Sequence, residues 1–113
     1  MQLTLTSRNV QINPELKAWI DSRLRFALGR FNGSIGRVKA TLADANGPRG
    51  GLDKQVQLEA GLLPRGRAIV EVVDNDMEAA VSRAAERLAR RVRDVLERRR
   101  DTRRRRRDAA ELN

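Results

Sequence analysis

Four short segments of the chain alternate apolar and polar side chains, and this period of two constrains the fold more than any other feature. The segments are 2–7, 35–42, 54–61 and 67–73. Such alternation is typical of strands that bury one face. Two other segments, 14–31 and 77–95, repeat apolar residues at helical spacing. The sequence therefore predicts the order strand, helix, three strands, helix.

Both predicted helices have one apolar stripe, and each predicted strand has one apolar face. Two helices on one side of a four-stranded sheet would bury all of these surfaces together. We therefore predict an α+β fold, a two-layer β-α-β-β-β-α sandwich with both helices on one face of the sheet. Loops at 46–51 and 64–66 connect the last three strands as a meander. Leu24, Val70 and Leu88 are expected between the layers, and the other sheet face is expected to be polar.

The positive charge is unevenly distributed along the 113 residues, whose net charge is +9. Residues 98–107 hold eight Arg and one Asp, whereas 1–97 hold 16 basic and 12 acidic residues. A length of 113 residues fits one domain. We expect that domain to span 1–98 and to be followed by an Arg-rich tail, 99–113, which is disordered because it has nothing to bury.

Several classes of function lack support in the sequence. The chain has no Cys and no His, so disulfides, thiolate metal sites and the commonest general base are absent. No apolar run is long enough to cross a bilayer. We expect a cytoplasmic protein that is not an enzyme, binds no metal, cofactor, membrane or small-molecule substrate, and is a monomer or weak dimer.

Arginines recur along one side of the second predicted helix. Arg83, Arg87, Arg90 and Arg98 share one sector, and Arg91 borders it. A surface helix needs charged residues, and Arg is a good helix former, so a solvated face explains the pattern equally well. The alternative is a ridge that binds phosphates, because guanidinium groups one turn apart can follow a sugar-phosphate backbone.

The first predicted helix combines aromatic and basic residues in one sector, namely Trp19, Arg23, Phe26 and Arg30. Aromatic rings beside Arg can stack on unpaired bases. More often such rings widen the buried face, and we favour that interpretation for Trp19 and Phe26. Arg23 and Arg30 remain candidate RNA contacts, as does Lys39 on the open sheet face.

Short motifs in a particular order carry a family resemblance. They are Leu3–Ile12, Arg23-Leu24, Arg30-Phe31, Asn46–Lys54, Asp76-Met77-x-Ala79-Ala80-Val81 and Arg87-Leu88-x-Arg90. Over about residues 1–98 the chain resembles the ribosome hibernation-promoting factor family, also called ribosome-associated translation inhibitor A. The chain departs from that family at Phe26, where members often carry a base, and at Glu78, where an aromatic residue usually follows Met.

The resemblance implies a function. Members bind the channel of the small ribosomal subunit used by messenger and transfer RNA, contact ribosomal RNA mainly through basic residues on both helices, and block translation in starved or stationary cells. By position, Arg23, Arg87 and Arg90 match best, with Arg83 and Arg91 as neighbours. The chain resembles the short form, without the extra C-terminal domain of long members.

Together, residues and resemblance predict a ribosome-associated translation inhibitor whose partner is the rRNA of the small subunit. The expected RNA-binding residues are Arg23, Arg30, Lys39, Arg83, Arg87, Arg90, Arg91 and Arg98. Two alternatives stay open: an accessory protein that binds another RNA, and a regulator that uses its arginines to bind an acidic protein.

Overall fold

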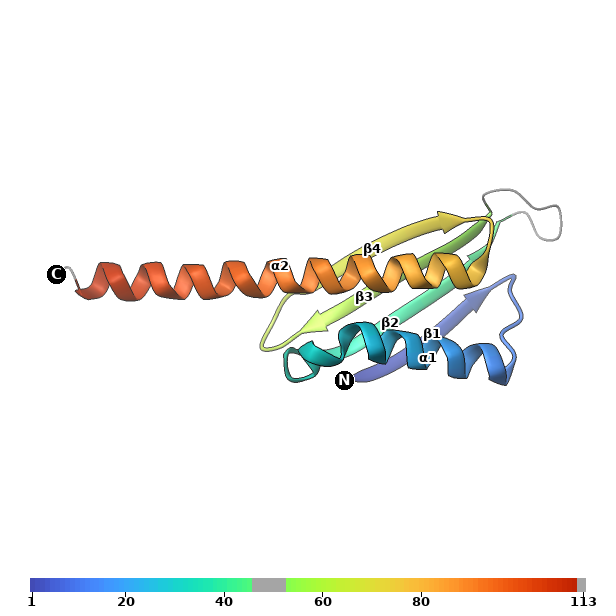
Figure 1. Cartoon of the computed structure of the whole chain (residues 1–113), viewed down its shortest axis with the longest axis horizontal. Helices are drawn as coiled ribbons and strands as arrows, with labels where there is room; N and C mark the ends of the chain where they lie inside the picture. The colour runs from blue at the N-terminus through green and yellow to red at the C-terminus, as the bar shows by residue number, and fades with distance from the viewer. Residues whose placement is uncertain (46–52, 112–113) are drawn as a thin grey trace.

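The computed structural model describes residues 1–45 and 53–111 and has the predicted order of elements (Figure 1). The elements are β1 (Gln2–Arg8), α1 (Pro14–Leu28), the 3-10 helix η1 (Gly29–Ser34), β2 (Ile35–Asp44), β3 (Lys54–Leu62), β4 (Arg67–Asp74) and α2 (Met77–Glu111). The predicted loop at 46–51 and most of the Asn46–Lys54 motif lie outside the described residues. The predicted α+β class is confirmed.

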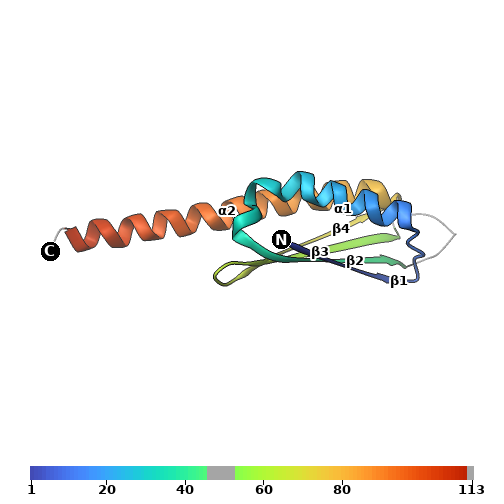
Figure 2. The same ribbon diagram turned by 90° about the horizontal axis from the view of Figure 1, so that it is seen from below.

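The four strands form one sheet in the order β1-β2-β3-β4. β1 and β2 are parallel and are connected through α1, whereas β2, β3 and β4 form the predicted antiparallel meander. One row across the sheet pairs Leu5 with Ala40, Ala40 with Leu58, and Leu58 with Val70. Both helices cover this side of the sheet, and the opposite side is left open (Figure 2).

The core lies between the sheet and the two helices. Leu24 and Leu88 are buried there, as predicted, together with Leu58 on a central strand. Val70 packs against this core but is only partly buried, so its predicted burial is wrong in degree. Ala68 and Val72, two residues away on the same face of β4, are buried. The exposure of Val70 is therefore local to this residue and does not follow from the place of β4 at the sheet edge.

Side-chain caps fix where both helices begin. The Asn13 Oδ1 accepts a hydrogen bond from the Leu16 N–H at 2.7 Å, and Pro14 occupies the first helical position. At α2, the Asp76 Oδ2 accepts from the Ala79 N–H at 2.9 Å. The predicted helix starts are therefore confirmed.

The C-terminal segment differs from the expectation. We expected 99–113 to be disordered, but α2 continues as a helix to Glu111, and 112–113 lie outside the described residues. Arg and Ala have high helix propensity, and extending a helix already nucleated in the domain costs little. The molecule is consequently elongated, with extents of 65 × 24 × 18 Å (Figure 1). None of the described helices is long and apolar enough to cross a membrane.

Candidate nucleic-acid interface

An open groove of about 400 Å³ runs between α1 and α2. Three of the predicted RNA-binding residues line it: Arg23 from α1, Arg30 from η1 and Arg90 from α2. Between the arginines the walls are formed by the small side chains of Ala27 and Ala89. The fold therefore brings together basic residues from three segments that are up to 67 residues apart in the sequence, from Arg23 to Arg90.

Contacts with neighbouring side chains orient the arginines of this groove. The Arg23 Nη2 donates to the Glu86 Oε1 at 3.1 Å, and the Arg23 side chain is 21% exposed. The Arg23 guanidinium also lies over the Phe26 ring, 5.9 Å from its centroid. The Arg30 guanidinium lies over the Phe31 ring at 4.6 Å. Such cation–π contacts restrict the guanidinium groups while leaving their N–H donors available.

Phe26 itself lies on the surface of this groove and is 85% exposed. The interpretation that it widens the buried face is therefore wrong, whereas Trp19 packs partly buried against the core as expected. The sequence held the signal: Phe26 follows the buried Leu24 by two residues, which is about 200° around a helix and nearly opposite to it. An exposed aromatic ring beside two arginines offers a surface on which a base can stack.

Glu86 was not among the expected functional residues, yet its carboxylate lies among the arginines of the groove. At 59% exposure it is the acidic member of an otherwise basic surface. It holds the Arg23 guanidinium in place, and it also opposes the approach of any anion.

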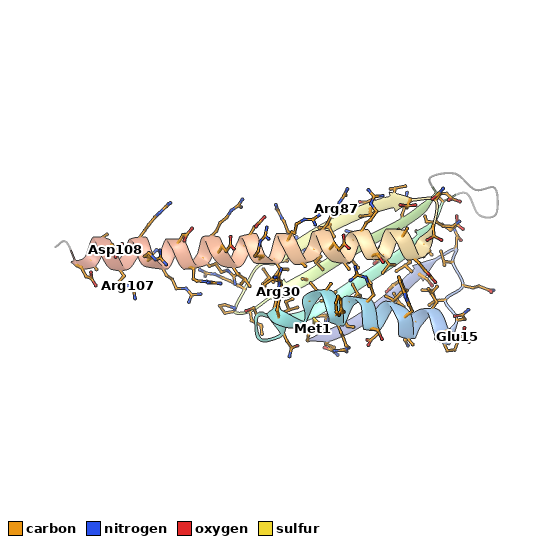
Figure 3. All side chains as sticks on the ribbon, viewed as in Figure 1. Met1, Glu15, Arg30, Arg87, Arg107 and Asp108 are labelled. Atoms are coloured by element: carbon orange, nitrogen blue, oxygen red, sulfur yellow. The ribbon has the colours of Figure 1, made fainter. Side chains whose placement is uncertain are left out.

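The remaining predicted residues of α2 do not line this groove. Arg83 is engaged elsewhere, because its Nη1 donates to the Asp74 Oδ2 at 3.0 Å. Backbone N–H donation from Asp76 and this contact with Arg83 lower the pKa of the Asp74 carboxyl. Arg87 and Arg91 are exposed on α2, and Arg87 projects on the side of the helix away from α1 (Figure 3).

Two other predicted residues lie in separate places. Lys39 borders a shallow depression on the open sheet face with Thr41, Gln57 and Glu59, so the sheet separates it from both helices. Arg98 lines a second hollow, near the turn between β3 and β4. Sequence reasoning missed Arg65, which lies at that turn, because nothing in the sequence indicated that α2 extends past it.

The acidic residues at strand ends have structural partners. The Lys54 Nζ donates to the Asp44 Oδ2 at 2.8 Å and to the Asp53 Oδ2 at 3.1 Å. These two hydrogen bonds, the one with Asp44 first, raise the pKa of Lys54. Within 1–45 and 53–111, no group of three or more acidic residues is placed to hold a metal ion.

Comparison with known proteins gives a family. Residues 3–100 match the family described as sigma 54 modulation protein / S30EA ribosomal protein. The N-terminal domain of Protein Y from Thermus thermophilus is similar, with 25% identity and a TM-score of 0.70, over 84% of this chain and 99% of that one. A ribosomal subunit interface protein from Coxiella burnetii shares the fold, with 18% identity and a TM-score of 0.72, over 86% of this chain and 99% of that one. No curated protein matches the chain. This match confirms the predicted relationship to the hibernation-promoting factors. The chain therefore belongs to the sigma 54 modulation protein / S30EA ribosomal protein family and is a ribosome-associated protein of translation regulation.

Proposed function

We propose that this protein binds rRNA of the small ribosomal subunit in the channel used by messenger and transfer RNA, and inhibits translation in the cytoplasm by occupying that channel without any turnover. The observation that carries the proposal is the groove between α1 and α2. Arg23, Arg30 and Arg90 converge there beside the exposed ring of Phe26. Because the chain belongs to a ribosome-associated family, we propose the ribosome as the source of that RNA.

The chemistry of the groove suits an RNA strand. Guanidinium groups donate two parallel hydrogen bonds to a phosphate, and such charge-assisted bonds are about twice as strong as neutral ones. The small side chains of Ala27 and Ala89 leave room for a backbone between the arginines. Phe26 offers its ring to an unpaired base, which is the usual target of sequence-tolerant stacking. The groove therefore provides both backbone contacts and a stacking contact.

The exposed arginines of α2 outside the groove extend this basic surface. Arg87 and Arg91 have no ion-pair partner among the described residues. In our proposal they contact phosphates of rRNA that passes over the side of α2 away from α1, where Arg91 follows Arg87 by one turn. Arg83 contributes less, because its guanidinium is already bonded to Asp74.

A sucrose-gradient experiment with small subunits tests the proposal. The test variant combines Arg30→Glu with Arg90→Glu, because neither residue forms an ion pair in the described part of the chain. Each reversal removes a charge-assisted contact of about 1.5–3 kcal/mol, so affinity for the subunit should fall about a hundredfold or more. The matched control combines Arg8→Glu with Arg37→Glu, which are exposed residues of the sheet.

We expect the groove variant to leave the subunit fraction and the control to remain in it. Equal loss in the two variants would show that net charge alone drives binding, which would contradict the proposal. If the wild-type protein binds RNA but does not migrate with small subunits, the alternative of another RNA target is correct instead. Circular dichroism checks that both variants are folded.

A further inference from the structure

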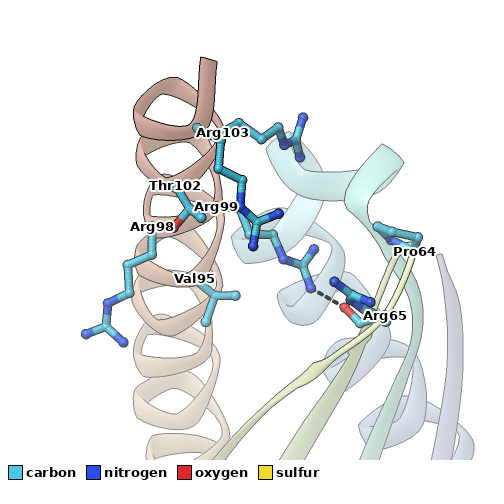
Figure 4. A pocket seen from close by; sticks show the side chains of 8 residues that line it. Pro64, Arg65, Val95, Arg98, Arg99, Thr102 and Arg103 are labelled. Carbon is cyan, nitrogen blue, oxygen red and sulfur yellow. Dashed lines mark hydrogen bonds between the residues drawn. The ribbon is translucent and has the colours of Figure 1, made fainter. Parts of the chain in front are cut away.

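A second hollow, of about 630 Å³, lies between the β3–β4 turn and the C-terminal part of α2 (Figure 4). Five arginines line it: Arg65 from the turn, and Arg98, Arg99, Arg103 and Arg106 from the helix. The described residues that line it include no acidic side chain. This surface therefore differs from the groove between α1 and α2, where Glu86 opposes anions.

Two hydrogen bonds from the Arg99 side chain connect the C-terminal part of α2 to the β3–β4 turn. The Arg99 Nη1 donates to the Leu63 carbonyl oxygen at 3.0 Å. The Arg99 Nη2 donates to the Arg65 carbonyl oxygen, the bond that Figure 4 marks with a dashed line. Gly66 makes this approach possible, because a Cβ on Gly66 would lie 2.8 Å from the Arg99 Nη2. The arginines beyond this point are thus presented from a helix attached to the domain.

The geometry of the hollow favours a chain of phosphates. Arg99, Arg103 and Arg106 follow each other at intervals of four and three residues, so they occupy one side of α2 in successive turns. Side chains at this spacing are about 5–6 Å apart at their Cβ atoms, which is comparable with neighbouring phosphates of one nucleic-acid strand. Arg65 faces them across the hollow from a different element. The uncharged side chains of Val95 and Thr102 also line the hollow.

We propose that this hollow is a second RNA-binding site, which holds the phosphate backbone of an RNA strand between the β3–β4 turn and the extended helix. The inference rests on the proposed function for its RNA partner, and it adds a site separate from the α1–α2 groove. Arg103 and Arg106 lie beyond residue 100, so the outer half of the site falls outside the part of the chain that matches the family.

Arg65 gives the decisive test, because it lies far from the Arg-rich segment in sequence. If the extension acts only as a basic arm, Arg65 has no special role. If the hollow is a site, Arg65→Glu should weaken binding of a fluorescein-labelled RNA duplex of non-ribosomal sequence about tenfold. The slope of log K against log salt concentration should fall by about one unit, corresponding to one phosphate contact. Arg8→Glu, at the opposite end of the sheet, should change the affinity less than about twofold.

A second pair of variants tests the helix side at constant charge. Arg103→Glu with Arg106→Glu alters the lining of the hollow, whereas Arg100→Glu with Arg104→Glu makes the same charge change outside it. We expect the first pair to lose about tenfold more affinity than the second. Polyglutamate, which stands for an acidic protein partner, should not displace the RNA duplex when it is added at an equal concentration of charge.

Three results would overturn the proposal: Arg65→Glu equal to Arg8→Glu, equal losses in the two double variants, or displacement of the duplex by polyglutamate. These three measurements use no ribosomes, so their results do not depend on the outcome of the Arg30/Arg90 experiment. If the hollow behaves as we expect but the wild-type protein does not migrate with small subunits, the protein binds RNA through the hollow and does not bind the small subunit.

Discussion

Replacing Glu86 with glutamine should strengthen binding to RNA, although it removes an ion pair. Glu86 is the carboxylate that lies among the arginines of the α1–α2 groove, 3.1 Å from the Arg23 Nη2. Glutamine keeps an oxygen that can accept the same hydrogen bond and removes the negative charge. The change therefore separates the positioning of Arg23 from the electrostatic opposition to phosphate.

The magnitude follows from exposure and distance. The two side chains are 21% and 59% exposed, so solvent screens the pair and its loss should lower the free energy of unfolding by less than about 1 kcal/mol. A phosphate about 6 Å from the Glu86 carboxylate would be repelled by about 0.7 kcal/mol in a water-like dielectric. Removing that repulsion should raise the affinity about threefold, and more if the groove excludes water.

Fluorescence anisotropy of the fluorescein-labelled protein, titrated with small subunits, measures the affinity. The slope of log K against log salt concentration should become steeper for Glu86→Gln. Glu71→Gln is the matched control, because it makes the same charge change on exposed β4, away from the groove. We expect the control to change the affinity far less. Weaker binding by Glu86→Gln, or the same gain in both variants, would refute the idea that this groove receives a phosphate.

Three further predictions concern the framework of the site. Leu88→Ala should lower the free energy of unfolding by about 2–5 kcal/mol in urea denaturation, because Leu88 is fully buried between the layers. Gly66→Ala should cost about 1–2 kcal/mol, since Gly66 has φ 94° and its Cβ would meet Arg99, whereas Gly29→Ala should be neutral or slightly stabilising because its Cβ meets nothing within 4 Å. Folding lowers the pKa of Asp74, so its contribution to stability is present above the ordinary pKa of 3.8 and is lost as the pH falls through the lower folded value. Urea denaturation of Asp74→Asn should therefore depend less on pH in this acidic range than the wild type does, and an unchanged dependence would contradict the assignment.

The layered fold was predictable because every element is specified by local pattern. Alternation identified the four strands, and Asn13 and Asp76 supplied the capping side chains that begin both helices. Val70 was misjudged because alternation gives the face of a strand but not how completely each residue on that face is covered: Ala68 and Val72 on the same face of β4 are buried, whereas Val70 is only partly buried. That cover depends on how the helices pack over the strand, which is a property of the tertiary structure.

The binding surfaces were harder to predict, because they depend on what tertiary packing brings together. A helical wheel shows that Arg90 is exposed, but not that Arg23 and Arg30 lie across a groove from it. The exposure of Phe26 was available from its angle to Leu24, and a general preference for burying aromatic rings led to the wrong interpretation. The second hollow could not be predicted while 99–113 was taken to be disordered.

Directed hydroxyl-radical probing shows whether the α1–α2 groove faces rRNA in the channel of the small subunit. The chain has no natural Cys, so one introduced cysteine can carry an iron chelate at a single known position. Ser22→Cys places the chelate on the exposed side of α1, one turn before Phe26 and beside the groove without filling it. Gln57→Cys places it on the exposed opposite face of the sheet. We predict strong cleavage from position 22 in the rRNA that lines the messenger and transfer RNA channel, and weak or different cleavage from position 57. Cleavage outside that channel from position 22, or strong channel cleavage from position 57 alone, would show that the groove does not face the channel.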